Sequence, residues 1–256
     1  MKYYKELAER ECFTRAYVEE LTGNAETASS LLQWYQKNDY IKLVKRNLYV
    51  TISMETGQTL PNRYRIASSI TDGSYISHHS AFEYYGLANQ VFYEVYVSGG
   101  KRFNSFEYDG VIYRYIAPRV KFGVVENSDG IRVTDIERTV IDGINNFEKN
   151  SGLEELLRCI ELIPYINEEQ LYDYLKRYDK QFLFQKTGYI LNHFRKELRL
   201  SDRFFEVCES KINKSVRYLY NGLEYEKNIF DNRWQLVVPE NLLKVLSQGS
   251  EIDNDL

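Results

Sequence analysis

The sequence predicts an α+β protein, with an N-terminal winged helix-turn-helix domain followed by a mixed α/β and then helical domain. Three observations lead to this fold class. Two short helices, a longer amphipathic helix and a strand pair with a basic turn follow one another within residues 1–52. Helical and β-rich stretches then mix up to about residue 150, and an Asp-Gly pair there predicts a hairpin. Helical patterns with capping residues dominate the stretch after that.

The first two helices are short. Tyr3 to Arg10 has apolar residues at helical spacing, and Thr14 can cap a second helix, Arg15 to Leu21, which Thr22-Gly23 ends. A short turn leads to Asn24, whose side chain can accept the first N–H groups of a third helix. This order of helices and turn is typical of a helix-turn-helix module.

The third helix, Asn24 to Lys37, is amphipathic. Its apolar stripe recurs at helical spacing and consists of Ala28, Leu31, Leu32 and Tyr35. Two β-forming runs follow the helix, and Lys45-Arg46-Asn47 separates them as the tip of a hairpin. The segment therefore predicts a recognition helix and a wing.

Polar and basic residues lie on the other face of this helix and on the hairpin. Short polar side chains can approach base edges, while Lys and Arg contact phosphates. The predicted DNA-binding residues are Asn24, Glu26, Thr27, Ser30, Gln33, Lys37, Lys42, Lys45 and Arg46. A helix followed by a hairpin is also a common structural unit, and a Lys-Arg pair often lies in a solvated turn.

Residues 53–62 contain Gly57 and Pro61 and lose the periodic pattern, which predicts a linker. The next domain is expected to span residues 63–216, and a C-terminal hairpin at Asn221-Gly222 with a frayed acidic tail is expected within residues 217–256. The expected elements of residues 63–216 are a helix at 63–69, a helix at 77–85 capped by Ser77, strands at 91–98, 106–108, 111–117 and 130–133, a helix at 136–146 capped by Asp135, and helices at 153–162, 168–178, 182–198 and from 201.

Composition indicates a globular chain that does not coat nucleic acid indiscriminately. The net charge is −4, and the first fifty residues hold eight Lys or Arg against seven Asp or Glu. Three scattered cysteines form no CxxC pair, the start MKYYKELAER is charged at once, and no stretch is apolar enough to span a membrane. We expect a cytoplasmic protein that has no membrane association.

An enzymatic function finds little support in the sequence. Asp135, Glu137 and Asp142 share one expected helix, but Asp135 stands at a cap and the other two point about 140° apart. Glu209-Ser210-Lys211 is a formal ExK motif, as in some nucleases, but it lies in a helical stretch. The neighbouring residues His78 and His79 diverge. We therefore expect no catalytic residues, no metal site and no cofactor.

Several motifs occur together in a characteristic order. They are KRNLYV at the wing, YISHHSAFEYYGL, VYVSGGKRF, YDGVIYRYI, Phe122-Gly123, GIRVTDIERTVIDGI and SGLEELLRCI. With this order and spacing the chain resembles the AbiEi family of antitoxins and transcriptional autoregulators from type IV toxin–antitoxin systems, over roughly Tyr3 to Ile212. The tail after Arg217 matches no part of that pattern.

The resemblance implies a function that combines two activities. Members of this family bind inverted repeats in their own promoter through the N-terminal domain, and the second domain counteracts a nucleotidyltransferase toxin in phage defence without a stable complex. Resemblance and charge together suggest an antitoxin surface at His78, His79, Glu83, Lys101, Arg102 and Arg138. Arg138 has a structural alternative, an i,i+4 pair with Asp142. The alternative functions are a ligand-sensing or dimerising winged-helix regulator and, further from the pattern, a nuclease.

Overall fold

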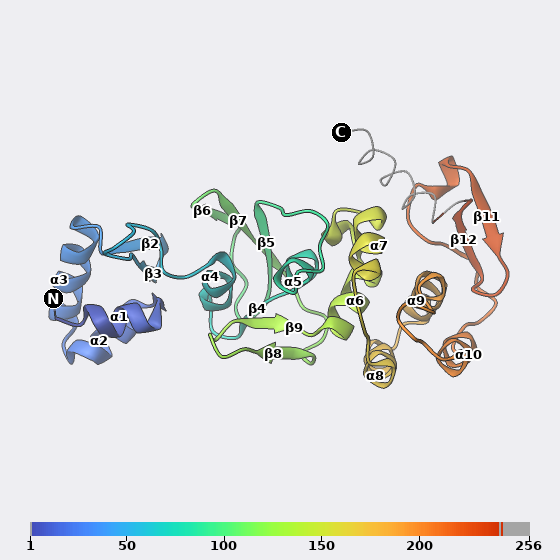
Figure 1. Cartoon of the computed structure of the whole chain (residues 1–256), viewed down its shortest axis with the longest axis horizontal. Coiled ribbons are helices and arrows are strands. Elements are labelled where there is room, and N and C mark those ends of the chain that lie inside the picture. Colours follow the sequence, from blue (N-terminus) through green and yellow to red (C-terminus); the bar gives the residue numbers. More distant parts are fainter. Residues whose placement is uncertain (1, 241, 243–256) are drawn as a thin grey trace. The chain divides into compact units, whose positions relative to one another are not determined.

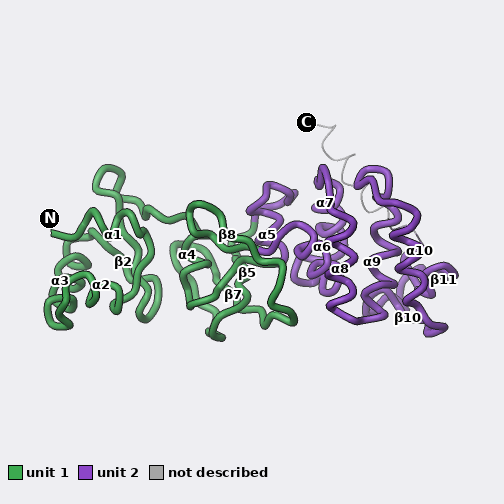
Figure 2. The backbone as a smooth tube through the Cα atoms, turned by 90° about the horizontal axis from the view of Figure 1, so that it is seen from below, with its two compact units in different colours: residues 1–77, 92–133 green, residues 78–91, 134–256 purple. Residues whose placement is uncertain are grey.

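The computed structural model describes residues 2–240 and 242, and these form a mixed α+β fold, as predicted. Two compact units can be distinguished (Figure 2). Unit 1 contains residues 1–77 and 92–133, and unit 2 contains residues 78–91 and 134–256. The predicted domain boundaries at residues 52 and 62 both lie inside unit 1. Independent folding of the segments on either side of residues 53–62 stays a prediction.

Unit 1 begins with helices packed on a small sheet (Figure 1). The elements are α1 (Tyr4–Arg10), β1 (Cys12–Phe13), α2 (Arg15–Thr22), α3 (Ala25–Lys37), β2 (Ile41–Lys45) and β3 (Leu48–Thr51). The sheet is antiparallel in the order β1-β3-β2. The hydrophobic core between these helices and the sheet includes Leu7, Phe13, Val18, Leu32 and Ile41. The apolar stripe of α3 is thus the face that this core buries.

Local capping explains where these helices begin and end. The side chain of Thr14 accepts a hydrogen bond from the backbone N–H of Tyr17, and α2 ends at Gly23 with φ at 69°. Asn24 accepts from the N–H groups of Glu26 and Thr27 at the start of α3. The caps predicted at Thr14, Gly23 and Asn24 are therefore confirmed.

The short strand β1 was not expected from the sequence. Cys12 and Phe13 pair with Val50 and Tyr49 of β3, and both residues are buried. Strands are predicted from an alternation of apolar and polar residues, and a strand of two residues is too short to show one. β1 also contacts α4 (Arg63–Ser69), the helix that follows the predicted linker. The segments before and after that linker therefore contact each other within unit 1.

Residues 52–60 form a closed turn. Ile52 bridges Thr59, the N–H of Ser53 donates to the Gln58 carbonyl, and the N–H of Leu60 donates to Thr51. Gly57 adopts φ of 70°, a conformation that glycine allows. The predicted linker is thus hydrogen-bonded to itself and to the end of β3.

The rest of unit 1 is a mixed six-stranded sheet in the order β6-β7-β5-β4-β9-β8. Its strands are β4 (Ser74–Ile76), β5 (Glu94–Gly99), β6 (Phe106–Tyr108), β7 (Val111–Ile116), β8 (Val124–Glu126) and β9 (Arg132–Thr134). β5 runs parallel to β7, while β4 and β6 are antiparallel to their partners β5 and β7. Asp109 and Gly110, both at positive φ, form the predicted two-residue turn between β6 and β7.

Unit 2 is helical and ends in a small sheet. Its elements are α5 (His79–Tyr84), α6 (Ile136–Asn145), η1 (Phe147–Asn150), α7 (Leu153–Glu161), α8 (Glu168–Tyr178), α9 (Gln181–His193), α10 (Asp202–Ser210), β10 (Arg217–Tyr218), η2 (Leu223–Tyr225), β11 (Asn228–Asp231) and β12 (Leu236–Pro239). Asp135, Asn167 and Ser201 cap α6, α8 and α10 as predicted. Trp234, just before β12, packs on α9 at Gly188, where any Cβ would overlap the indole ring.

Three expected details are wrong. The helix expected over residues 182–198 ends at His193, and turns follow it over residues 194–199. Ser77 does not cap α5, because its hydroxyl bonds Ser98 at 2.8 Å and His78 stands at the N-cap with φ of 55°. The C-terminal hairpin is β11–β12, and Asn221-Gly222 lies in a turn before it, since the longer β-forming runs 228–231 and 236–239 pair with each other. The expected fraying of the tail from residue 248 lies outside the described residues.

Candidate functional site

The exposed face of α3 carries the polar residues predicted to contact DNA. Glu26, Thr27, Ser30, Gln33 and Lys37 are all exposed. Four of them recur at spacings of three or four residues, so they form a stripe opposite the buried one. The stripe leaves one face of α3 free of contacts with the core of unit 1.

An exposed aromatic residue flanks this stripe. Trp34 is 48% exposed, and its ring stacks on that of Tyr40 with centroids 5.6 Å apart. Tyr40 in turn contacts Tyr35 of the core. The sequence analysis did not single out Trp34, although a tryptophan just outside the apolar stripe of an amphipathic helix is a readable signal.

The hairpin tip is fixed to the start of α2. Lys45 pairs with Leu48, which leaves Arg46 and Asn47 as a two-residue loop. Asn47 adopts φ of 64°, and its side-chain oxygen accepts a hydrogen bond of 3.0 Å from the N–H of Arg15. Arg46 and Lys42 are exposed beside it. The loop therefore presents basic groups at a defined place relative to the helices.

Lys45 does not belong to this exposed basic group, contrary to expectation. Its ammonium lies 4.7 Å from the ring centroid of Phe103 and 5.1 Å from that of Phe106, and burial lowers its pKa. The register of β2 shifts between Leu43 and Lys45, which redirects the side chain. Strand alternation alone does not predict this irregularity.

The residues predicted to form the antitoxin surface separate into buried and exposed groups. His79 is 1% exposed, the side chain of Glu83 is also 1% exposed, and His78 is buried. The expectation that these three face outward is wrong, because the first turn of α5 is buried on every side. Lys101 and Arg102 are exposed, as expected.

His79 lies between two carboxylates. Its Nδ1 is 3.2 Å from Oε1 of Glu83, and its Nε2 is 3.1 Å from Oε1 of Glu155 on α7. Burial by itself lowers the pKa of His79, but the hydrogen bonds to Glu155 and Glu83 outweigh it and raise the pKa above its ordinary value. Sequence reasoning missed this cluster because its members are far apart along the chain.

Arg138 has the structural role considered as its alternative. Its Nε donates to Oδ2 of Asp142 at 2.7 Å, and the Tyr178 hydroxyl donates to the other oxygen of Asp142. Arg138 is 1% exposed. The Asp142 carboxylate thus joins α6 to α8, and the buried guanidinium that pairs with it presents no charge at the surface.

The other candidate carboxylates are also used in packing. Oδ2 of Asp135 accepts from the hydroxyl of Tyr174 at 2.5 Å, and Glu137 accepts from the N–H of Asn167 at 2.7 Å. Glu209 forms an ion pair with Arg233. Each of these carboxylates therefore connects two elements of unit 2.

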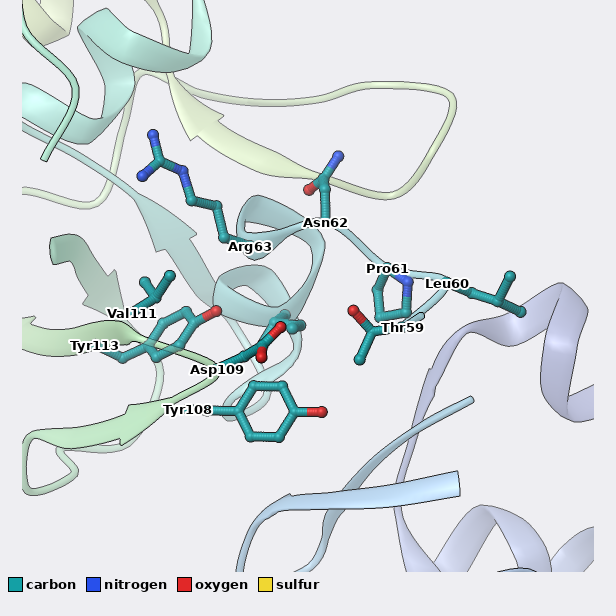
Figure 3. Close-up of a pocket in the computed structure, with 10 residues that line it drawn as sticks. Thr59, Leu60, Pro61, Asn62, Arg63, Tyr108, Asp109, Val111 and Tyr113 are labelled. Carbon is teal, nitrogen blue, oxygen red and sulfur yellow. The ribbon is translucent and has the colours of Figure 1, made fainter. Parts of the chain in front are cut away.

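A pocket of about 300 Å³ lies inside unit 1 (Figure 3). Tyr108, Asp109 and Tyr113 line it from the β6–β7 hairpin, opposite residues 59–62. Arg63 extends away from the pocket and donates to the Phe92 carbonyl. The hydroxyl of Tyr108 is buried and has no hydrogen-bond partner among residues 2–240. The size is at the lower end for a small-molecule site.

No protein-family model matches this sequence, and no curated protein matches it. The fold is similar to the crystal structure of the RV2827C protein from Mycobacterium tuberculosis, with a TM-score of 0.65 and 15% sequence identity. The similarity covers 97% of this chain and 94% of the other. It concerns the fold over nearly the whole length of both chains. Within the described part of the chain, every helix is too short or too polar to cross a membrane.

Proposed function

We propose that the protein is a DNA-binding transcriptional autorepressor and an antitoxin that counteracts a nucleotidyltransferase toxin in a type IV toxin–antitoxin system. Residues 1–52 act as the winged helix, with α3 as the recognition helix and β2–β3 as the wing. The observation that supports this most is the exposed polar stripe of α3 beside a basic hairpin whose tip is hydrogen-bonded to α2.

The roles within the stripe follow from side-chain chemistry. The Ser30 hydroxyl and the Gln33 amide can each donate and accept hydrogen bonds, and they read base edges. The positive charges that contact phosphates are those of Lys37, Lys42 and Arg46. Because the whole chain carries a net charge of −4, affinity for arbitrary DNA is low and base contacts decide the site. These are the properties that an autorepressor of one promoter requires.

The antitoxin surface is proposed at the loop after β5. Gly99 and Gly100 adopt positive φ, and a Cβ at Gly99 would meet the Gly73 carbonyl and the Tyr75 ring. The N–H of Lys101 donates to Oγ1 of Thr71 at 3.1 Å. The backbone is thus held tightly, and Lys101 and Arg102 project from a rigid turn. The other side chains first assigned to this surface pack in the interior, namely those of His78, His79, Glu83 and Arg138.

A growth assay combined with a promoter-binding assay tests the proposal. Co-expression with the nucleotidyltransferase encoded beside this gene should restore growth, and the purified protein should retard a fragment of its own promoter. Rescue and DNA binding should each be removable by separate substitutions. A chain that neither binds the promoter nor restores growth would overturn the proposal.

A ligand-sensing regulator is the second candidate, and the pocket beneath the β6–β7 hairpin favours it. A small molecule bound to Tyr108 and Asp109 would lie within the same unit as the winged helix. Tyr108→Phe removes the partnerless hydroxyl while keeping the ring. If a ligand controls repression, this variant should repress normally and lose induction in cells.

A further inference from the structure

Three potential metal ligands meet in the interior of unit 2. His79 comes from α5, while Glu155 and Cys159 are one helical turn apart on α7. One ligand atom from each lies within 4.8 Å of the others, and all three residues are buried. The residues have no part in the proposed DNA-binding and antitoxin functions.

We propose that His79, Glu155 and Cys159 bind a divalent transition-metal ion, with zinc as the ion that fits best. An imidazole, a carboxylate and a thiolate are all ligands that zinc accepts, and the thiolate disfavours magnesium and calcium. Three protein ligands leave the fourth position of a tetrahedral ion to a water molecule. The ion would join α5 to α7.

The distances match those between ligands of one ion. Nε2 of His79 is 3.1 Å from Oε1 of Glu155, and Sγ of Cys159 is 3.6 Å from the same oxygen. Ligands of a tetrahedral zinc ion, bound at about 2.0–2.3 Å, lie roughly 3.3–3.8 Å apart. Only small side-chain shifts separate this arrangement from a coordinated one.

Glu83 occupies the position of a supporting carboxylate. Its Oε1 is 3.2 Å from Nδ1 of His79, the nitrogen that faces away from Glu155. A carboxylate this close favours a proton on Nδ1, which leaves the lone pair of Nε2 for a metal. A carboxylate, histidine and metal in a row is a recurrent arrangement around zinc.

The cluster is also rich in negative charge. The side chains of Glu83 and Glu155 are 1% and 6% exposed, so two carboxylates share one imidazole in a buried place. Even a protonated His79 leaves one excess negative charge, which the N–H groups of Asn89 and Gln90 offset only in part. Oε2 of Glu155 is buried and has no hydrogen-bond partner in the described residues.

Metal binding would be coupled to proton release. A cysteine that binds zinc does so as a thiolate, so Cys159 would have to give up its thiol proton. The ion would displace that proton and the one on Nε2 of His79, so two positive charges would replace two protons and the net charge of the cluster would stay the same.

The test is metal analysis of the full chain, purified without a polyhistidine tag. Elemental analysis should find stoichiometric zinc, and titration of the metal-free chain with cobalt(II) should produce thiolate charge-transfer absorption with tetrahedral d–d bands. Cys159→Ser should lose the charge-transfer band and bind zinc roughly tenfold or more weakly. Cys208→Ser, which removes a buried cysteine of α10, is the matched control and should keep both.

Two further measurements keep the test decisive if Cys159→Ser does not fold. Zinc should raise the melting temperature of the wild-type chain, and Glu155→Gln, which is nearly the same size, should reduce that shift. A wild-type chain that contains substoichiometric zinc and gives no thiolate–cobalt band would overturn the proposal, because His79 would then bridge two carboxylates by protons alone. A band that persists in Cys159→Ser would overturn it as well.

Discussion

Asn47, in the loop of the β2–β3 hairpin, accepts a hydrogen bond of 3.0 Å from the backbone N–H of Arg15, the first residue of α2. The bond satisfies one of the free N–H groups at a helix start and joins the hairpin to the helices at the same time. If the hairpin is a wing, this single contact sets its angle.

Asn47→Gly and Asn47→Ala should separate the hydrogen bond from the backbone conformation. Glycine accepts φ of 64° but removes the bond, whereas alanine also loses about 1 kcal/mol because it is strained there. Both variants should bind promoter DNA more weakly, and only the alanine variant should melt clearly lower. Fluorescence anisotropy and thermal unfolding measure the two effects. Unaltered promoter affinity in both variants would show that the hairpin position does not matter for binding.

Arg46→Ala and Lys42→Ala should reduce affinity for all DNA sequences alike. Each should reduce the dependence of log K on log salt by about one phosphate contact. Lys45→Ala should instead lower stability and leave that slope unchanged, since its ammonium lies over Phe103 and Phe106. Titrations at several salt concentrations provide the comparison.

Ser30→Ala and Gln33→Ala should change sequence preference more than overall affinity. Both side chains are exposed on α3, and loss of a base contact relaxes selection at one position by about 1–3 kcal/mol. Binding-site selection from a randomised promoter would measure this. A uniform loss across all sequences would assign these residues to the backbone contacts.

Lys101→Glu with Arg102→Glu should abolish rescue from the toxin and spare promoter binding. The residues are exposed, so charge reversal costs little stability. Lys211→Glu with Lys214→Glu makes the same charge change at two other exposed lysines and should keep rescue. Growth, melting temperature and promoter binding are to be measured on both. Full rescue by the first variant would place the antitoxin surface elsewhere.

Arg138→Ala should also lose rescue, but through unfolding. Removal of one partner from a buried pair costs about 3–5 kcal/mol, because the Asp142 carboxylate would lose its ion-pair partner in the interior. Urea denaturation should show the loss directly. A variant of native stability that fails to rescue would restore the functional role first suggested for Arg138.

Stability should rise with pH between about 8 and 10.5 because of Lys186. Its ammonium lies between the rings of Phe147 and Phe182, and burial lowers its pKa to about 8 from 10.5. Above pH 8 the folded chain releases this proton while the unfolded chain keeps it, so the penalty of burying the charge disappears. Lys186→Met should remove this rise. Denaturant titrations of both proteins across that range are the measurement.

Local signals were sufficient for much of the fold. Thr14, Asn24, Asp135, Asn167 and Ser201 cap helices as predicted, because a cap depends only on neighbours in sequence. The turn at Asp109-Gly110 is local for the same reason. The exposed residues of α3 follow from the helical period alone.

The missed features depend on contacts between distant residues. His79 meets Glu155 across 76 positions, and no periodicity connects them. The amphipathic pattern predicts that the polar residues of a helix face solvent. The first turn of α5 is buried on all sides, so its polar residues instead find partners in the interior. Lys45 was misplaced by a register shift within one strand.

The packing of Trp234 on Gly188 has a consequence for synthesis of the chain. The indole that covers α9 is synthesised after that helix and after α10, so these helices leave the ribosome before the side chain that completes their packing. The helices and hairpin of residues 1–52 complete their contacts much earlier. A nascent or prematurely terminated chain would therefore carry a folded residue 1–52 segment while its helical part remains open to proteases and chaperones.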